Sequence, residues 1–273
     1  MEFSVLMSIY YKETVSNLRQ SLDSVLSNTV QPNEIVIIKD GKLTDELEQC
    51  LQEYQTNYDF IKIYGYEQNK GLGLALQFGV EKCQYEWIAR HDTDDICDKF
   101  RFEKQIKFLE ENPKCTMVGS FVAEFIDNLD NVISQVELPT SYEDIVKFSK
   151  KRTPFRHPTL FMKKADIISA GNYQDCYLVE DYDLITRMLQ NETYALNIPS
   201  NLVYMRVSKD FYNRRGGWKY CKSINKFMKT LRKRKYISFM RYLSNITIRT
   251  IVSLSPSWLR SWIYKHKLRK KVK

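Results

Sequence analysis

The sequence predicts an α/β protein with a mostly parallel central sheet flanked by helices, followed by a basic helical C-terminal extension. In the first part of the chain, short apolar segments rich in β-branched residues alternate with longer segments whose apolar residues recur at helical spacing. This alternation is typical of strand–helix–strand units with parallel strands. Towards the C-terminus the composition changes to lysine, arginine and aromatic residues.

The individual elements follow from local patterns of apolar residues and from helix-ending signals such as Asn112-Pro113 and Gly171. We expect strands at 3–10, 34–38, 60–66, 116–126, 132–138, 160–163 and 202–207. We expect helices at 14–28, 44–55, 100–111, 142–149, 165–170 and 178–189. Ligands of open parallel sheets bind beyond the carboxyl ends of the strands. Predicted strands end shortly before Asp40 and Asn69, and the short apolar segment Trp87–Ala89 comes just before the acidic residues that start at Asp92. We therefore expect these side chains to meet in one crevice.

Composition indicates a folded globular protein of 273 residues, with 43% hydrophobic and 27% charged residues. This length allows one large domain or a domain with an appendage. The six cysteines are scattered without a CxxC pair, which argues against a zinc site or a disulfide framework and favours a reducing cytoplasm. The N-terminus lacks a basic region and a cleavage site, so we expect no signal peptide.

The net charge of +9 hides a division along the chain. Residues 1–205 carry 21 Lys and Arg against 32 Asp and Glu, whereas residues 206–273 carry 21 Lys and Arg against a single acid, Asp210. The pattern predicts an acidic globular part and a basic part that meets an anionic partner.

Asp92-Thr93-Asp94-Asp95 places three carboxylates within four residues, directly after the apolar segment Trp87–Ala89. Such charges repel one another, and an oxygen-only ligand set favours Mg²⁺ or Mn²⁺, usually shared with substrate phosphates. The alternative is an exposed acidic loop that caps the following helix. Capping requires one Asp, so the metal interpretation is preferred.

Glycines 71, 73 and 79 loosely suggest a dinucleotide-binding loop. The strict GxGxxG spacing fails because position 76 is Leu, and the segment follows the third predicted strand, not the first. We therefore interpret these glycines as a turn followed by close helix packing.

Glu180-Asp181 stands at the start of an apolar helical segment, where the helix dipole stabilises negative charge. Two interpretations stay open from these residues alone. Asp181 is either an N-terminal cap or a carboxylate that acts as a general base in the crevice.

Four segments in this order carry the motifs: 3–13, Ile37–Gly41, Asp92–Asp95 with the helix from Lys99 to Gln105, and Glu180–Leu184. Together they resemble the family 2 glycosyltransferases, which use nucleotide sugars and have the GT-A fold, and among them the bacterial polysaccharide or O-antigen repeat-unit enzymes. The second segment is similar to the family's VVDDGS run, with Lys39 in place of its first Asp. The resemblance covers residues 3 to about 217 and implies a nucleotide-sugar half at 1–115 and an acceptor half at 116–217.

The resemblance also implies roles for individual residues. Asp40 would accept a hydrogen bond from the uracil of a UDP-sugar, Asp94 would ligate Mn²⁺ or Mg²⁺, and Asp92 would bind ribose or the metal. Asp181 would deprotonate the acceptor hydroxyl, with Glu180 positioning it. The remaining residues assigned to the UDP-sugar are Ser8, Tyr10, Glu13, Asn69, Gly71, Arg90, Arg214 and Arg215. In secondary roles, Asp95 would cap the helix near Lys99, and His157 either faces the acceptor or is a structural loop residue.

Arg214-Arg215-Gly216-Gly217-Trp218 follows the last predicted strand and differs from the QxxRW motif of processive family members. We expect one sugar to be transferred per encounter. The two arginines belong either to a mobile loop that closes over the diphosphate or to a solvated turn.

Residues 218–273 combine basic and aromatic side chains, and Arg241 and Arg249 interrupt their most apolar stretch, 236–254. A spanning helix needs about 20 mostly apolar residues, so amphipathic helices on an anionic membrane surface are the better prediction. Nucleic acid is the less favoured partner and is not expected, because the acidic half would repel phosphates. The predicted location is the cytoplasm, on the inner face of a bacterial plasma membrane.

These expectations combine into one functional hypothesis. An inverting hexosyltransferase would move galactose from UDP-galactose, or glucose from UDP-glucose as second choice, to a sugar on a polyprenyl diphosphate carrier, making a β-linkage in O-antigen or capsule. A sugar-nucleotide nucleotidyltransferase is an alternative, but the glycine-rich basic loop that it needs after the first strand is replaced by residues 8–13. A nucleic-acid-binding module resting on the basic tail is the third possibility.

Overall fold

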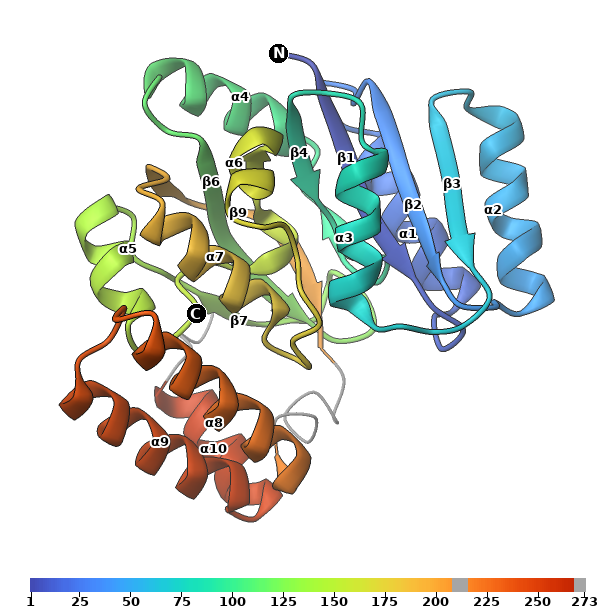
Figure 1. Ribbon diagram of the computed structural model, residues 1–273. Helices are drawn as coiled ribbons and strands as arrows, with labels where there is room; N and C mark the ends of the chain where they lie inside the picture. Colours follow the sequence, from blue (N-terminus) through green and yellow to red (C-terminus); the bar gives the residue numbers. More distant parts are fainter. Residues whose placement is uncertain (208–215, 268–273) are drawn as a thin grey trace.

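The structure, a computed structural model, describes residues 1–207 and 216–267 (Figure 1). The first part contains β1 (Phe3–Ile9), α1 (Val15–Leu26), β2 (Glu34–Asp40), α2 (Asp45–Asn57), β3 (Ile61–Tyr66), α3 (Leu72–Lys82) and β4 (Trp87–Arg90). The second part contains β5 (Ile96–Cys97), α4 (Arg101–Glu111), β6 (Met117–Phe125), β7 (Val132–Val136), α5 (Tyr142–Ser149), the 3₁₀ turn η1 (His157–Thr159), β8 (Phe161–Lys163), α6 (Lys164–Ser169), α7 (Glu180–Gln190) and β9 (Ala195–Arg206). The C-terminal extension contains α8 (Gly217–Lys233), α9 (Phe239–Leu254) and α10 (Ser257–Lys267).

One nine-stranded sheet runs through the protein in the order β3-β2-β1-β4-β8-β6-β9-β5, with β7 paired to β6. The first four strands in this order, β3, β2, β1 and β4, are parallel to one another, as predicted for the nucleotide-sugar half. Beyond β4 the sheet is mixed: β8 is antiparallel to both its neighbours, and β6 and β9 pair in parallel. The parallel half therefore brings the carboxyl ends of β1, β2 and β4 to one edge, as the ligand crevice requires.

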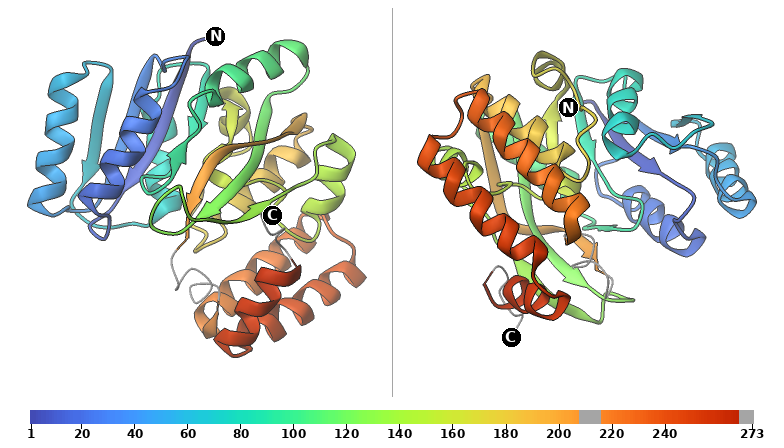
Figure 2. Two further views of the ribbon diagram at one scale, coloured as in Figure 1. Left: turned by 180° about the vertical axis from the view of Figure 1, so that it is seen from behind. Right: turned by 60° about the horizontal axis from the view of Figure 1, so that its bottom comes forward.

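Both faces of the sheet are buried because side chains alternate along the strands. In β1, Phe3, Val5 and Met7 pack into the core under α1, α2 and α4, whereas Leu6 packs with α3 and α7 on the other face. Figure 2 shows α1, α2 and α4 on the reverse of the molecule. Continuous apolar runs in β1 and β2 are the expected signature of strands covered on both sides.

The predicted helices and strands are present, and the differences concern the sheet's second half. The predicted strand 202–207 is only the last part of β9, which begins at Ala195. The short strand β5 was not predicted; it pairs with β9 through Ile96 and Cys97. A two-residue strand has too little pattern to be recognised in a sequence.

The C-terminal extension packs on α7 and on the end of α5. Ile224, Phe227 and Met228 of α8 share an apolar cluster with Val179 and Tyr182. Further links join Arg234 to the carboxylate of Asp183 at 2.9 Å and Nδ2 of Asn245 to the carbonyl of Lys150 at 2.9 Å. Figure 1 shows the three helices beside α7, below the sheet. Among the helices of residues 1–207 and 216–267, none is both long and apolar enough for a membrane span.

Candidate active site

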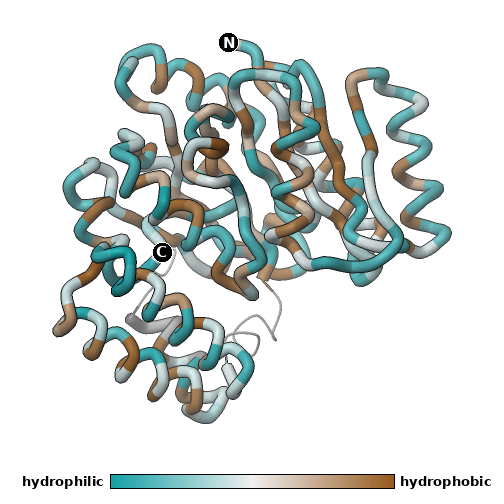
Figure 3. Tube along the Cα trace, in the orientation of Figure 1, coloured by the Kyte–Doolittle hydropathy of each residue, from teal (hydrophilic) through white to brown (hydrophobic). Residues whose placement is uncertain are grey.

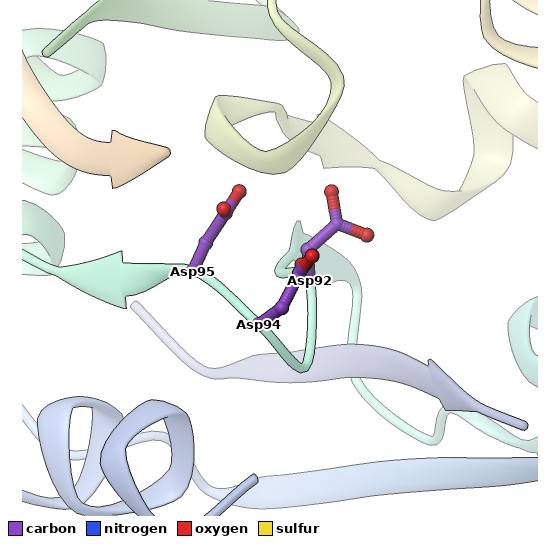
Figure 4. A group of neighbouring side chains, drawn as sticks. All are labelled: Asp92, Asp94 and Asp95. Atoms are coloured by element: carbon purple, nitrogen blue, oxygen red, sulfur yellow. The ribbon is translucent and has the colours of Figure 1, made fainter. Parts of the chain in front are cut away.

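The loop after β4 gathers three carboxylates. Asp92, Asp94 and Asp95 each offer an oxygen that lies within 4.8 Å of the others (Figure 4). The loop is fixed by neighbouring elements, because Ser21 Oγ donates to the carbonyl of Asp92 at 2.8 Å and Arg206 Nε donates to that of Asp94 at 3.0 Å. The acidic cluster is thus a rigid feature at the carboxyl end of the parallel sheet.

Electrostatics within the cluster favour a bound cation. Burial, with the charges of Asp92 and Glu13, raises the pKa of Asp94 to about 7. Burial and the charges of Asp94 and Asp92 raise the pKa of Asp95 well above its ordinary value. A divalent cation relieves this repulsion, and hard oxygen donors are what Mg²⁺ and Mn²⁺ prefer. The residues therefore fit such an ion.

The prediction that Asp95 caps the helix near Lys99 is wrong. Its Oδ1 accepts a hydrogen bond from the backbone N–H of Arg206 at 2.9 Å, and its buried Oδ2 has no hydrogen-bond partner within the described residues. At the start of α4, the N–H of Phe100 is instead bound by Asp98 Oδ1 at 3.1 Å. Pairing with β9 through β5 turns Asp95 back towards the cluster.

Arg90, at the end of β4, is a buried cation beside the acidic cluster. Its Nη2 forms an ion pair with Asp92, and its Nε and Nη1 find no hydrogen-bond partner in residues 1–207 and 216–267. An unsatisfied buried guanidinium is costly, so these two N–H groups are suited to an anionic ligand. Arg90 thus presents spare donors where a phosphate would lie next to a bound cation.

The strand end that carries Arg90 is held by Arg101, a buried residue to which sequence analysis gave no role. Arg101 Nη2 donates to the carbonyl of Arg90 at 2.8 Å, and its Nη1 lies 3.1 Å from His91 Nδ1. Burial and the charges of Arg101 and Arg90 lower the pKa of His91 well below its usual range, so this imidazole is neutral. No local signal in the sequence marks an arginine that is fully buried.

Asp40, Asn69 and Gly71 come together at the end of β2, whereas the expected meeting of Asp40 and Asn69 with the acidic loop in one crevice stays a prediction. The carboxylate of Asp40 accepts from the Tyr66 hydroxyl at 2.8 Å and from the backbone N–H of Gly71 at 3.0 Å, while Asn69 Nδ2 donates to the Asp40 carbonyl at 3.0 Å. Asp40 therefore organises the turn, and its contact with uracil stays a prediction. Gly71 has a φ of 92°, which favours glycine.

The glycines of α3 allow the close packing that the sequence indicated. A Cβ at Gly73 would overlap the carbonyl oxygen of Gln174, and one at Gly79 would overlap the side chain of Leu6. Gly73 also faces Glu180 Cβ, so its missing side chain lets α3 approach the segment that leads into α7. This contact helps to place the first turn of α7 at the crevice.

Glu180 and Asp181 stand at the start of α7 and line a cavity together with Asp92 of the acidic loop. The cavity, of about 210 Å³, is lined by Asp92, His157, Glu180 and Asp181 among others. Burial and the charge of Asp181 raise the pKa of Glu180 to about 8, so Glu180 is protonated at neutral pH. The N-cap residue of α7 is Val179, which rules out Asp181 as its capping residue.

Two acidic centres thus face one cavity in an α/β protein. The sequence model of glycosyl transferase family 2 matches residues 4–170. The chain belongs to this family.

Relatives along the whole chain agree with the family. The chain is 39% identical to the UDP-Gal:α-D-GlcNAc-diphosphoundecaprenol β-1,3-galactosyltransferase of Escherichia coli, over 98% of this chain and 97% of that protein. It is 36% identical to an amylovoran biosynthesis glycosyltransferase of Erwinia amylovora, over 96% and 97% of the two chains. A mannosyltransferase from Pyrobaculum calidifontis, solved with GDP-mannose and Mn²⁺, superposes with a TM-score of 0.65 at 13% identity, covering 95% of this chain and 72% of that chain. The protein has the GT-A fold.

His157 lies in the cavity of the glycosyltransferase and also has a structural bond. Its Nε2 is 2.9 Å from the hydroxyl of Tyr173, and burial together with the charge of Arg90 lowers its pKa well below the usual range. His157 therefore has the structural contact of the second alternative, and its role towards the acceptor stays a prediction.

Three other residues that were assigned to the UDP-sugar lie at or just after the carboxyl end of β1. Glu13 Oε2 accepts from Thr93 Oγ1 at 3.0 Å, which links Glu13 directly to the acidic loop. Ser8 is partly buried at the end of β1, and Tyr10 is exposed beside Tyr11. Arg214 and Arg215 lie outside the described residues.

Proposed function

We propose that this glycosyltransferase is an inverting, metal-dependent hexosyltransferase that moves galactose from UDP-galactose to a hydroxyl of a sugar on a polyprenyl diphosphate. UDP-glucose is the second choice of donor. The observation that supports this mechanism is the shared cavity, which is lined by Asp92 of the acidic loop after β4 and by Asp181 of α7. The choice of galactose and of the acceptor rests on the galactosyltransferase that is 39% identical over almost the whole chain.

On the donor side, the acidic loop and Arg90 would hold the diphosphate. Asp94, Asp92 and Asp95 would hold Mn²⁺ or Mg²⁺, which when bound offsets the negative charge that develops on the UDP leaving group. The two spare N–H groups of Arg90 would donate to a phosphate oxygen on the same side. Asp40, Asn69 and the turn at Gly71 would bind the uridine part, together with Ser8, Tyr10 and Glu13. Arg214 and Arg215 would add positive charge over the diphosphate.

On the acceptor side, Asp181 would act as the general base. It is less buried than Glu180, and Glu180 keeps its proton at neutral pH, so the negative charge of the pair resides on Asp181. Asp181 would take the proton of the acceptor hydroxyl as that oxygen bonds to C1 of the donor sugar. The bond from C1 to the UDP oxygen breaks on the opposite face, so an α-linked donor gives a β-linked product. Protonated Glu180 would donate a hydrogen bond and position its neighbour.

We propose that this reaction belongs to surface polysaccharide biosynthesis, O-antigen or capsule, and takes place at the cytoplasmic face of a membrane. The two relatives named above act on a diphosphoundecaprenol-linked sugar and in amylovoran biosynthesis, respectively. We propose residues 1–217 as the catalytic domain and 218–273 as the region that associates with anionic lipid. Family membership disfavours the nucleotidyltransferase alternative.

A donor screen tests the proposal directly. Purified protein is incubated with a synthetic lipid diphosphate carrying GlcNAc and with UDP-galactose, UDP-glucose or UDP-GlcNAc, each with Mn²⁺, with Mg²⁺ or with EDTA. We expect transfer from UDP-galactose that requires the metal and a β-anomeric proton in the NMR spectrum of the product. Transfer that persists in EDTA, or an α-linked product, would contradict the metal-dependent inverting mechanism.

A further inference from the structure

The buried residues of helix α9 are polar, whereas most of its large apolar side chains are exposed. Asn245 and Ser253 are its buried residues, and Arg249 Nη2 donates to the carbonyl of Lys151 at 2.6 Å. Thr250 Oγ1 accepts from Asn225 of α8 at 3.0 Å. A surface helix of a globular protein normally turns its apolar stripe to the core and its polar side to water. In α9 only Tyr242 and Ile246 clearly follow that pattern by packing against the α8 cluster, and six other large apolar side chains are exposed.

The outward side of α9 is mostly apolar, with the exposed Ser244 and Thr247 between its apolar side chains. Its large apolar side chains are between 39% and 74% exposed, and at about 100° per residue they all fall within one half of the helix circumference. We call them the α9 face: Phe239, Met240, Leu243, Ile248, Ile251 and Leu254. Trp258 at the start of α10 is also exposed, and Figure 3 shows hydrophobic residues recurring along α9. A row of this length is far more than the single apolar residues found scattered on soluble surfaces.

The extension that carries the α9 face is positively charged. Lys222, Lys226, Lys229 and Lys233 form an exposed row on α8, which packs beside α9. Residues 216–267 contain no Asp or Glu. An apolar helix face on a positively charged extension, with tryptophan near its end, has the chemistry that anionic lipid headgroups and the upper acyl chains recognise. A nucleic acid would engage the lysines but would leave the apolar stripe in water.

The C-terminal extension packs directly against the start of α7, the helix that carries Glu180 and Asp181. Val179 and Tyr182, which flank Glu180 and Asp181, pack against α8, and the Tyr182 hydroxyl donates to the carbonyl of Ser149 at 2.5 Å. Figure 1 shows the arrowheads of β1, β2 and β3 pointing to the side of the molecule on which α8–α10 lie. A surface that binds these helices therefore approaches the side on which the crevice opens.

We infer that the α9 face, with Trp258, is the docking surface for an anionic lipid bilayer, in which it lies at the depth of the headgroups and holds the crevice next to the membrane. The advantage of this docking rests on the proposed function, since a polyprenyl-linked acceptor presents its sugar close to the lipid headgroups. It goes beyond charge-driven adsorption of a basic tail, because it assigns the contact to a defined apolar face.

Vesicle sedimentation tests the inference without reference to activity. Full-length protein is mixed with vesicles of neutral phosphatidylcholine, or of phosphatidylcholine with phosphatidylglycerol, and compared with the double variant Ile248→Ser/Ile251→Ser. Ile168→Ser, an exposed apolar site on α6, is the matched control. We expect binding of the wild type and of the control to anionic vesicles and at least about a tenfold weaker partition of the double variant, from the loss of two buried isoleucines. Equal partition of all three proteins would overturn the inference.

Transfer assays separate the docking surface from the proposed reaction. With a short-chain, water-soluble acceptor, the double variant should match the wild type, whereas with the acceptor embedded in anionic vesicles its rate should fall about tenfold. If no protein transfers galactose but the vesicle result holds, the proposed function fails and the docking surface stands. If light scattering shows a wild-type dimer that the double variant loses, with vesicle binding unchanged, the α9 face is an interface between two copies and the inference is wrong.

Discussion

Replacing Glu180 by Gln should stabilise the protein in a pH-dependent way. Glu180 loses its proton near pH 4.5 in the unfolded chain but near pH 8 in the folded chain, because of burial and the neighbouring Asp181 charge. Between these values the unfolded chain binds fewer protons than the folded chain, so the stability that this group contributes falls as the pH rises. Gln carries no charge and removes that fall.

The size of the effect follows from the shift. One pKa unit corresponds to about 1.4 kcal/mol, so at pH 7 the buried carboxyl costs the folded chain about 3 kcal/mol. For a chain of this length that difference raises the melting temperature by about 6 to 12 °C. At pH 4.5 the folded chain holds the proton and the unfolded chain holds it half of the time, so the difference between the two proteins should shrink to about 0.4 kcal/mol. Activity at pH 7 should survive, since Gln replaces a neutral group.

Urea denaturation at several pH values between 4.5 and 8, with EDTA present, measures this difference. Glu81→Gln, at an exposed site on α3, serves as the control and should change the stability little at any pH. An advantage of Glu180→Gln that is the same at pH 5 and pH 8, or absent at pH 7, would refute the assignment of a protonated Glu180 beside a charged Asp181.

Three further substitutions, with a fourth as a control, test separate parts of the structure. Asp94→Asn should weaken Mn²⁺ binding in calorimetry and lower the transfer rate at least about a hundredfold. Without metal the variant should be more stable than the wild type, because the repulsion of Asp94 with Asp92 and Glu13 is removed. An unchanged Mn²⁺ affinity would argue against Asp94 as a ligand. Gly73→Ala should lower the unfolding free energy by about 1–3 kcal/mol, because its Cβ overlaps the carbonyl of Gln174, and an unaltered urea midpoint would contradict the close approach. Asp183→Asn should cost about 3 kcal/mol, because Asp183 is buried and pairs with Arg187 and Arg234 at 2.9 Å each. Lys163→Gln, which breaks the exposed pair with Glu86, should cost less than about 1 kcal/mol, and equal losses would count against the buried link.

Local patterns were enough to predict the nucleotide-sugar half. Apolar runs such as Glu34–Asp40 predict buried strands because both faces of the parallel sheet are covered, and the acidic residues stand directly after β4. The first part of β9 could not be predicted in this way. Asn197, Pro199 and Asn201 interrupt its apolar pattern, and its pairing with β6 is shifted near Ser120. Only contacts distant in sequence make this segment a strand.

The burial of charged side chains near the site could not be predicted from the sequence either. Arg101 reads as one more basic residue of an amphipathic helix, and nothing nearby in the sequence indicates that it is buried against His91 and the carbonyl of Arg90. The same holds for α9, whose apolar and polar residues predict an amphipathic helix but not which side faces the protein. That side is set by polar partners such as Lys150 and Asn225, which are distant in sequence.

The most direct test of the central claim is the rate of galactose transfer by Asp181→Asn at pH 7 with saturating UDP-galactose, Mn²⁺ and the soluble GlcNAc-diphosphate acceptor. Asn keeps the size and hydrogen-bonding ability of Asp181 but cannot take the acceptor proton. A fall of about a hundredfold to ten-thousandfold is expected, with UDP-galactose binding unchanged. A rate near that of the wild type would contradict the assignment of Asp181 as the base that faces the metal-bound donor.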